Sequence, residues 1–437
     1  MRNKKRRVFL FSAPDYRALE QYLAKEAEKG WLLEKVGVLF AQFIRIEPRK
    51  VKFQVDIYSE HSVFDSPEDP RILEYRELCL ENGWKFLTSA GKMQIFWAEE
   101  DEETSPLQSE ISIEKSIVAK TIKPELVIFL ICIPALYLAL GELFNPGYHS
   151  LVYCSGIAAL IAYPLVFLPI LLYTGDYLLW FVRANLNVRK GRALPASKLN
   201  WVLFRGRLLY FMTSLAVLIL FWGLLKDFMN GYYYPLYKML FPVTGITVGL
   251  LFRTKGVSAK RTRGQNQSVF AFLLIGMLIF LNVTTNIFAN SASGGFDRLL
   301  GAKNELPAGY QAMQLQDIGV HEEPEQIRFY PQKSILVPRS FEYYERSEKG
   351  YFRTRFWQAR DEALNERIFE QLLNAEERRP YREVKETLPT PYGAERAYIL
   401  NEREDAILLR YREKIVLLEG GEPLIGLAEQ IKSKFTL

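Results

Sequence analysis

Residues 206–225 read GRLLYFMTSLAVLILFWGLL, a run whose only charged side chain stands at its second position. A helix needs about 20 mainly apolar residues to cross the roughly 30 Å hydrocarbon core of a bilayer, so this run is suited to span a membrane. With four similar stretches it makes five predicted spans: Glu125–Leu143, Leu151–Thr174, Gly206–Leu225, Tyr234–Phe252 and Ser268–Ala289. We therefore predict a membrane α-helical bundle of five transmembrane helices over residues 124–289, with the lipid bilayer as its surroundings.

The charges of the chain are unevenly distributed. Residues 1–124 carry 20 Lys and Arg against 21 Asp and Glu, residues 297–437 carry 22 against 25, and the middle of the chain carries 14 against 4. Two stretches without acids, residues 183–207 and 253–263, hold most of this basic excess: Arg183, Arg189, Lys190, Arg192, Lys198, Arg205 and Arg207, then Arg253, Lys255, Lys260, Arg261 and Arg263. A nucleic-acid-binding protein gathers such charge on a folded domain, so no nucleic-acid partner is predicted.

Short basic loops mark the cytoplasmic side of a membrane protein. Because the number of predicted spans is odd, the amino terminus is predicted in the cytoplasm and the carboxy terminus outside it. Trp180 and Trp201 at the inner boundary, and Trp222 at the outer one, agree with an interfacial aromatic belt. The amphipathic stretch Asp176–Val188 is expected either to lie along the inner surface or to extend the second span.

The amino-terminal region contains an internal repeat. Residues 19–31 read LEQYLAKEAEKGW, and residues 72–84 read ILEYRELCLENGW. In each copy a helical pattern ends at a Gly, which supplies the left-handed residue that closes a helix, and a Trp opens a pair of apolar strands. We predict a cytoplasmic α+β domain over residues 1–98, built as a tandem βαββ repeat, and an acidic linker over residues 99–123.

These paired helix-Gly-Trp-strand units, followed by several apolar spans, resemble the uncharacterised bacterial membrane family "domain of unknown function 2812". The resemblance covers about the first hundred residues. It implies a bacterial source, a place in the cell membrane and a regulatory context, because members are often encoded beside PadR-type repressors. The family has no assigned activity, so the resemblance implies no catalytic residue.

Six glycines and tryptophans are candidate site residues. Gly30, Trp31, Gly83 and Trp84 are predicted to stop helices and fill the core. The alternative is that the two Trp rings line a groove for an unknown protein partner. Gly245 and Gly249, four residues apart, let helix backbones approach closely, either within the chain or between two copies in a homo-oligomer.

The alternation of apolar residues over 296–437 predicts an extracytoplasmic α+β domain, which follows a polar hinge at residues 291–295. Strands are expected near 326–330, 334–338, 341–345, 351–357, 397–400, 406–412 and 414–419, and helices near 359–378 and 423–434. The chemistry-bearing candidates are His321-Glu322-Glu323 for a metal ion and the pair Glu366 and Glu370 for acid–base work. A solvated surface is the simpler interpretation of both.

The sequence contains no catalytic, nucleotide or cofactor motif, so we predict no enzyme, no cofactor and no metal site. The two domains are predicted on opposite faces of the membrane, and the helices between them carry no charge near the middle of the bilayer. This arrangement favours a sensor, regulatory or partner-binding protein that links an outer domain to a cytoplasmic domain. The alternative is a transport or self-protection factor that handles an amphipathic compound or lipid. An enzyme acting on an envelope substrate is a third hypothesis.

Overall fold

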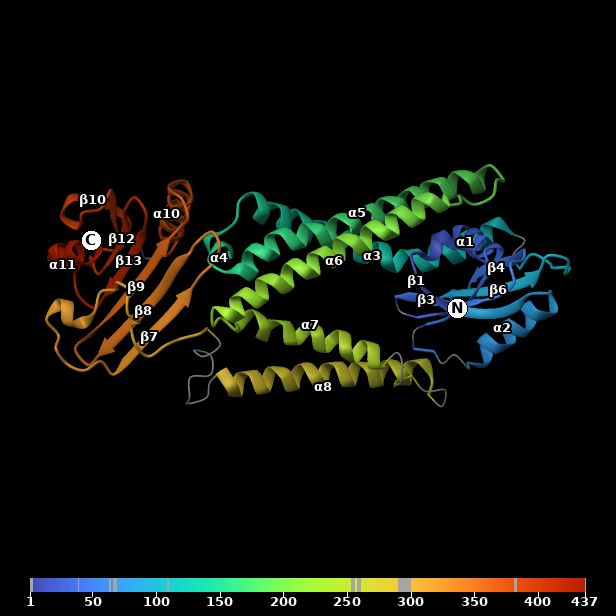
Figure 1. Cartoon of the computed structure of the whole chain (residues 1–437), viewed down its shortest axis with the longest axis horizontal. Helices are drawn as coiled ribbons and strands as arrows, with labels where there is room; N and C mark the ends of the chain where they lie inside the picture. Colours follow the sequence, from blue (N-terminus) through green and yellow to red (C-terminus); the bar gives the residue numbers. More distant parts are fainter. Residues whose placement is uncertain are drawn as a thin grey trace. The chain divides into compact units, whose positions relative to one another are not determined.

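A computed structural model describes residues 3–37, 39–62, 64–65, 69–107, 110–252, 256–257, 261–289, 300–380 and 383–436. It contains long helices and separate antiparallel sheets (Figure 1). The chain divides into two compact units. The first unit holds Met1–Leu138, Tyr163–Ala216 and Val243–Leu278, and the second holds Ala139–Ala162, Val217–Pro242 and Ile279–Leu437.

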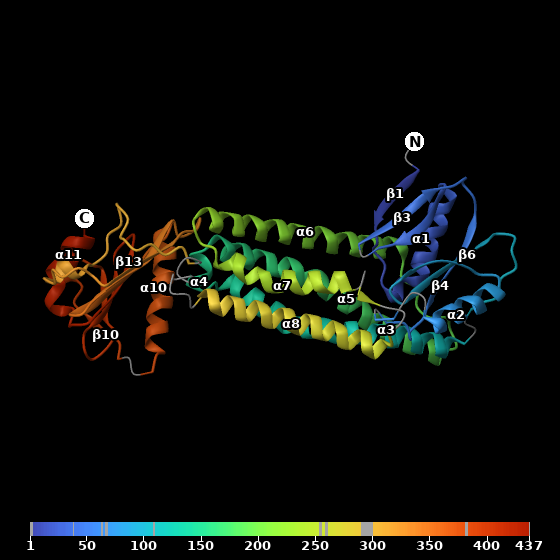
Figure 2. The same cartoon turned by 90° about the horizontal axis from the view of Figure 1, so that it is seen from below.

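The amino-terminal domain begins with a three-stranded antiparallel sheet in the order β1-β3-β2 (Figure 2). Its strands are β1 (Lys4–Val8), β2 (Trp31–Val36) and β3 (Phe40–Arg45), and α1 (Tyr16–Glu28) connects β1 to β2. The basic residues Lys4, Lys5, Arg6 and Arg7 at the start of the chain therefore lie in a strand, whereas so many charges in a row would suggest a solvated tail. Lys5 forms an ion pair with Glu26 on α1, which explains how a basic strand packs beside a helix.

A second three-stranded sheet follows, in the order β4-β6-β5. Its strands are β4 (Val51–Ile57), β5 (Lys85–Ala90) and β6 (Met93–Glu99), and α2 (Pro70–Glu81) connects β4 to β5. Each half of the domain thus runs strand, helix, strand, strand, and in each half the last strand lies in the middle of its sheet. Each half forms a sheet of its own, whereas the sequence suggested one antiparallel sheet for both.

The helices that follow are α3 (Ile111–Phe144), α4 (Tyr148–Leu151), α5 (Cys154–Arg189), α6 (Leu199–Met229), α7 (Tyr234–Leu251) and α8 (Arg263–Ala289). In the part of the chain that the structure describes, four helical segments are long and apolar enough to cross a membrane. They lie in α3, α5 and α6 and over Arg263–Thr284 of α8, as expected for a multi-pass membrane protein. The fourth predicted span coincides with α7. Its side chains at 236–238 and 241–242, Lys238 included, lie outside the described residues, so the count of five spans stays a prediction.

Helices α3 and α5 extend furthest beyond their predicted spans. Helix α3 begins at Ile111, so residues 111–123 are helical although they were expected in a linker. Val118 and Ile122 of this extension are buried against the amino-terminal domain, which holds it in place. Helix α5 continues without a break to Arg189, so the amphipathic stretch Asp176–Val188 extends the second span. The predicted hinge at 291–295, with Arg253, Lys255 and Lys260, lies outside the described residues.

The carboxy-terminal domain is a seven-stranded antiparallel sheet in the order β10-β11-β12-β13-β9-β8-β7. Its strands are β7 (Gln326–Gln332), β8 (Arg339–Ser347), β9 (Gly350–Gln358), β10 (Lys385–Thr387), β11 (Arg396–Ile399), β12 (Ala406–Arg410) and β13 (Ile415–Gly420). The strand expected at 334–338 is absent, and β10 was not foreseen. Because successive side chains of a strand point to opposite faces, Ile407 packs in the cluster that includes α11 (Ala428–Phe435), and Leu408 packs in the one that includes α10 (Glu362–Glu377). Helices therefore help to cover both faces of this sheet.

Candidate functional site

The two Gly-Trp pairs end helices. Gly30 and Gly83 have φ angles of +78° and +87°, a conformation that only Gly adopts at little cost. The indole N–H of Trp84 donates to the carbonyl oxygen of Ser105 at 2.8 Å. Trp31 is half-buried, and the Nζ of Lys5 lies 4.9 Å from its ring centre. Trp31 packs against the large cluster around α1, whereas Trp84 belongs to a separate cluster with Cys79 and Phe96. A partner groove between the two Trp rings stays a prediction.

Close helix approach occurs at glycines other than the predicted pair. A Cβ added at Gly245 or Gly249 would meet no described atom within 4 Å. A Cβ at Gly206 would instead lie 2.7 Å from the Cβ of Leu10 in the amino-terminal domain. At Gly223, in the second unit, it would lie 2.6 Å from the Cβ of Ala158 on α5. Gly206 and Gly223 are thus the α6 glycines beside which neighbouring segments leave no room for a side chain.

A buried ion cluster joins the amino-terminal domain to helices α5 and α6. At its centre, Arg205 of α6 is only 2% exposed. Its Nη2 donates to Oδ2 of Asp15 at 2.6 Å, and its Nη1 donates to Asp176 of α5. The guanidinium carbon lies 4.1 Å from the ring centre of Tyr173, which is within cation–π range. We call Asp15, Arg205 and Asp176 the docking cluster.

Each acid of the docking cluster has further donors. The backbone N–H and the hydroxyl of Ser12 donate to Asp15 at 3.1 and 2.6 Å, and the indole N–H of Trp201 donates to Asp176 at 2.8 Å. Burying a charge costs several kcal/mol unless close counter-charges and hydrogen bonds offset it. The docking cluster therefore specifies how the domain sits against the helices, because any other arrangement leaves a buried charge without a partner.

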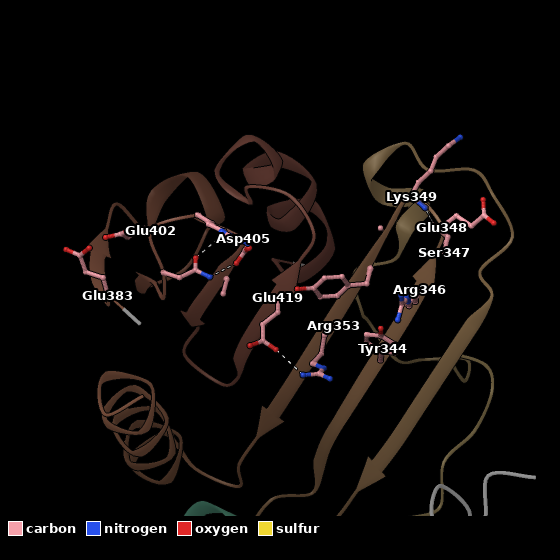
Figure 3. Close-up of a pocket in the computed structure, with 15 residues that line it drawn as sticks. Tyr344, Arg346, Ser347, Glu348, Lys349, Arg353, Glu383, Glu402, Asp405 and Glu419 are labelled. Carbon is pink, nitrogen blue, oxygen red and sulfur yellow. Dashed lines mark hydrogen bonds and ion pairs between the residues drawn. The ribbon is translucent and has the colours of Figure 1, made fainter. Parts of the chain in front are cut away.

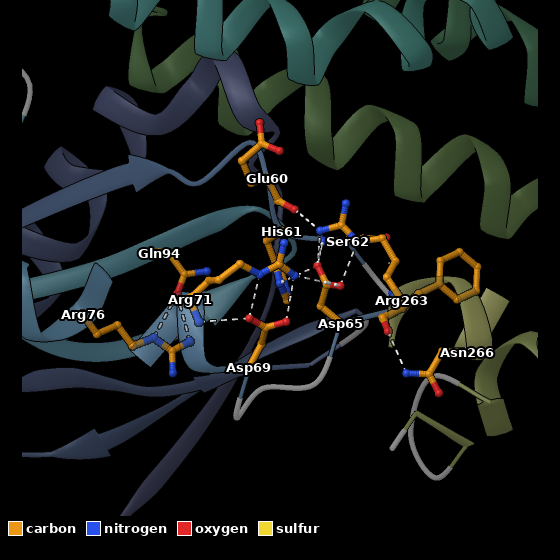
Figure 4. Close-up of polar contacts among 11 residues, drawn as sticks. Glu60, His61, Ser62, Asp65, Asp69, Arg71, Arg76, Gln94, Arg263 and Asn266 are labelled. Atoms are coloured by element: carbon orange, nitrogen blue, oxygen red, sulfur yellow. Dashed lines mark hydrogen bonds and ion pairs between the residues drawn. The ribbon is translucent and has the colours of Figure 1, made fainter. Parts of the chain in front are cut away.

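A second attachment connects the segment after β4 to the start of α8 (Figure 4). Arg263 donates to the two carboxylate oxygens of Asp65 at 2.8 and 2.6 Å, and the side-chain amide of Asn266 donates to the Phe64 carbonyl oxygen at 3.0 Å. Burial alone would raise the pKa of Asp65, but hydrogen bonds from Arg263 and from the Ser62 N–H outweigh it and hold that pKa below its ordinary value. Asp65 is thus held as an anion against α8.

A third attachment surrounds a small polar cavity beside α3. Glu114 of α3 accepts hydrogen bonds from Arg17, at 3.1 Å, and from the Tyr16 hydroxyl. These three residues help to line a cavity of about 200 Å³ that also contains Glu20 and Asp56. Burial raises the pKa of Glu20 to about 7, although the Val55 N–H donates to its carboxylate. Glu20 is therefore a carboxyl group that titrates near neutral pH.

Glu20 predicts a pH-dependent stability. Its folded-state pKa lies above the ordinary value of 4.5, so the stability that it contributes is present at acid pH and is lost as the pH rises through about 7. Between pH 5 and pH 8 we expect wild type to lose up to about 3 kcal/mol relative to Glu20→Gln, since one pKa unit corresponds to about 1.4 kcal/mol. Thermal unfolding of the purified protein against pH measures this loss. Glu28→Gln, which alters an exposed carboxylate of the same helix, should keep the wild-type slope, and equal slopes for wild type and Glu20→Gln would contradict the prediction.

The carboxy-terminal domain contains a larger open cavity of about 1200 Å³ (Figure 3). It lies where the β8–β9 turn approaches the segment between β11 and β12, and both signs of charge line it: Arg346, Lys349, Arg353 and Arg403 with Glu348, Glu383, Glu402, Asp405 and Glu419. Arg353 donates to Glu419 at 3.3 Å across its floor. Small-molecule sites are usually lined mainly by apolar side chains, whereas this open cavity is lined mainly by charged ones.

Three of the four carboxylates singled out from the sequence, those of Glu322, Glu366 and Glu370, form ion pairs. Glu322 pairs with Lys349 at 2.5 Å. Glu366 and Glu370 both accept from Nη1 of Arg396, at 2.9 and 2.6 Å, so this face of α10 pairs with the sheet. Among the described residues, no group of three or more His, Cys, Asp or Glu side chains is arranged to hold a metal ion.

The two helix-Gly-Trp-strand units and the first part of α3, which packs against them, occupy about the first third of the chain. Residues 15–132 match the model of the family described as Protein of unknown function (DUF2812). This match confirms the resemblance seen in the sequence. We call residues 15–132 the DUF2812 region. It begins at Asp15 of the docking cluster and ends within α3, so it includes the first part of a candidate membrane helix. No curated protein and no solved structure matches the chain.

Proposed function

We propose that this chain is a five-span membrane protein that regulates or binds a protein partner by linking an outer domain to a cytoplasmic DUF2812 region. The observation that carries the proposal is that each folded domain holds helix ends through buried polar contacts. In the first unit this role falls to the docking cluster. In the second unit it falls to Asp227 and the segment around Ser334.

The contacts in the second unit are as specific as the docking cluster. Asp227 of α6 is 1% exposed, and its two carboxylate oxygens accept the N–H groups of Cys154 and Ser155 at 2.8 and 2.9 Å. A carboxylate at this position satisfies donors that the first turn of α5 leaves without helical partners. The hydroxyl of Ser334 donates to the Leu151 carbonyl oxygen just before α5. The carboxy-terminal domain is therefore fastened to the last residue of α4, shortly before α5, the helix that carries Asp176.

Two observations support five spans and their orientation, and a third supports the repeat in the amino-terminal domain. Each of α3, α5, α6, α7 and α8 has one end in the first unit and one in the second, as five crossings require. The basic residues from Arg183 to Arg207 belong to the first unit, which supports its place in the cytoplasm. The equal strand orders β1-β3-β2 and β4-β6-β5 support two copies of one βαββ unit.

The proposed partners follow from the two domains. The mixed-charge cavity of the outer domain suits a polar ligand, and the DUF2812 region would bind a cytoplasmic protein. The alternative, a transporter, usually places ionisable side chains at mid-depth. In the described parts of α3, α5, α6 and α8, such side chains lie near the ends of the predicted spans or beyond them, as Glu125 of α3 and Asp176 of α5 do. No contact in the described residues specifically favours transport.

The proposal is tested by weakening the Asp227 contact in the second unit and measuring hydrogen exchange in the DUF2812 region. We expect Asp227→Asn, in the full-length protein in lipid nanodiscs, to raise amide hydrogen exchange both at the start of α5 and in residues 12–20 of the DUF2812 region. Lys226→Gln removes an exposed charge next to Asp227 and should change neither. Exchange that rises only within the second unit would contradict communication between the domains. The orientation is checked beforehand in intact cells, where an impermeant thiol reagent should label Lys349→Cys and leave Lys29→Cys unlabelled.

A further inference from the structure

The two halves of the amino-terminal domain repeat each other in structure as well as in sequence. Their sheets have the same strand orders, β1-β3-β2 and β4-β6-β5. In the first half the ring of Tyr22 on α1 meets that of Phe43 on β3 edge-on, with the ring centres 6.3 Å apart. In the second half Tyr75 of α2 meets Phe96 of β6 in the same way, at 6.2 Å. This correspondence aligns α1 with α2, and β3 with β6, residue by residue.

Helix α1 is covered on two sides, once by its own sheet and once by the sheet of the other half. On the second side, the Val55 N–H of β4 donates to the carboxylate of Glu20 at 2.8 Å. Ala24 and Ala27 of the same side pack in the cluster that includes Phe53 and Val55 of β4. The chain thus already contains one interface between the helix of one half and the sheet of the next.

The corresponding side of α2 is exposed. Leu73, Glu77 and Leu80, spaced four and three residues apart, lie on one face of the helix and take the places of the α1 residues that pack on β4. We call these three residues the helix face. Large apolar side chains that gather on one exposed face are typical of a surface that another element covers.

A second exposed surface lies on the first sheet, at the positions that α1 covers on the second sheet. The register of the two sheets matches the pairs Arg6–Gln42 and Val8–Phe40 with the pairs Val55–Ile95 and Ile57–Met93. All four residues of the second sheet are buried in the cluster around α1. Arg6, Val8 and Phe40 are exposed instead, and we call these three residues the sheet face.

The helix face and the sheet face complement each other. On the helix face an acid, Glu77, lies between two Leu residues, and on the sheet face a base, Arg6, lies beside two apolar residues. Among the described residues neither Glu77 nor Arg6 forms an ion pair, so each charge is open to a partner. Because both faces are exposed in the single chain, they do not cover each other within it.

We propose that the first units of two copies of this chain associate, with the helix face of one copy packed on the sheet face of the other as α1 packs on β4. Glu77 then pairs with Arg6 of the other copy, and the Leu side chains cover its Val8 and Phe40. The contact joins two different surfaces, so it can continue from copy to copy. The inference goes beyond the proposed function, since it requires neither the number of spans nor their orientation.

The test measures how well one tagged full-length copy recovers a second, differently tagged copy from mild detergent. We expect wild-type copies to be recovered together and Leu80→Lys to lower the recovery about tenfold or more, as the loss of a central contact residue does. Leu78→Lys is the matched control. Leu78 is 56% exposed and Leu80 57%, but Leu78 lies outside the helix face and corresponds to the exposed Lys25 of α1. This control should keep most of the recovery.

A charge exchange tests the pairing of Glu77 with Arg6 directly. Glu77→Arg gives a copy whose two faces are both positive, and Arg6→Glu gives a copy whose two faces are both negative, so neither variant should associate with itself. A mixture of the two variants should associate again, because each positive face then meets a negative one. This recovery also shows that both variants are folded.

Four outcomes would overturn the proposal. Wild-type copies that stay apart at every concentration would do so, as would equal losses for Leu78→Lys and Leu80→Lys. Association that survives both charge reversals would belong to another surface, such as Gly245 and Gly249. Recovery that responds to Arg6→Glu and to anionic lipid, but not to Glu77→Arg, would assign the sheet face to the membrane surface. None of these outcomes affects the exchange measurement with Asp227→Asn, which tests the proposed function separately.

Discussion

Replacing Arg205 by Met should destabilise the first unit by about 3–5 kcal/mol, because it leaves the carboxylates of Asp15 and Asp176 buried without their counter-charge. Asp15 is fully buried and Asp176 largely so, and Met keeps much of the apolar volume of the Arg stem. We expect a lower melting temperature in detergent and faster proteolysis between β6 and α3. Thermal scanning and limited proteolysis of the purified full-length protein measure these changes.

The neighbouring Arg207 supplies the matched control. It belongs to the same helix, two residues further on, but its side chain is exposed, so Arg207→Met should change stability by less than about 0.5 kcal/mol. Adding Asp15→Asn to Arg205→Met removes one buried charge and should restore part of the loss. If Arg205→Met and Arg207→Met have the same stability, the docking cluster does not hold the domain to the helices.

The second large effect is expected at Gly223, where a Val side chain cannot fit. An added Cβ would lie 2.6 Å from the Cβ of Ala158 and 2.8 Å from the carbonyl oxygen of Cys154. The backbone of α5 cannot move aside as a flexible side chain would, so α6 must separate from α5. Overpacking of this kind costs about 1–3 kcal/mol, and more where backbone atoms are involved. We expect Gly223→Val to lower the melting temperature and to increase hydrogen exchange at the start of α5.

Gly249→Val is the control for Gly223→Val, because an added Cβ there meets no described atom within 4 Å. It should leave the stability of the single chain nearly unchanged. It also tests the homo-oligomer predicted from Gly245 and Gly249, since a Val in a helix–helix contact between two copies would lower the oligomeric state in size-exclusion measurements. Equal destabilisation by Gly223→Val and Gly249→Val would show that the close approach of α6 to α5 is not the cause.

Local patterns in the sequence were enough to place most elements. Long apolar runs predicted the positions of the long helices, because each residue of such a run favours lipid whatever its neighbours are. Gly30 and Gly83 correctly predicted where α1 and α2 end, because the left-handed residue that closes a helix is a local requirement. Boundaries were less accurate where a distant contact decides them. Residues 111–123 look like the end of an acidic linker, but Val118 and Ile122 find apolar partners in the domain and the helix begins early.

The sequence by itself determined that this is a chain of apolar helices between two mixed domains, and it pointed to the family whose model matches residues 15–132. It could not indicate the docking cluster, because Asp15 and Arg205 are 190 residues apart and each resembles an ordinary surface charge in its own segment. It pointed to Gly245 and Gly249 for close packing, which stays a prediction, and it did not single out Gly206 and Gly223, which neighbouring segments crowd in the tertiary structure. Which charge is buried and which glycine is crowded depends on what another part of the chain places beside it, and only the folded structure decides that.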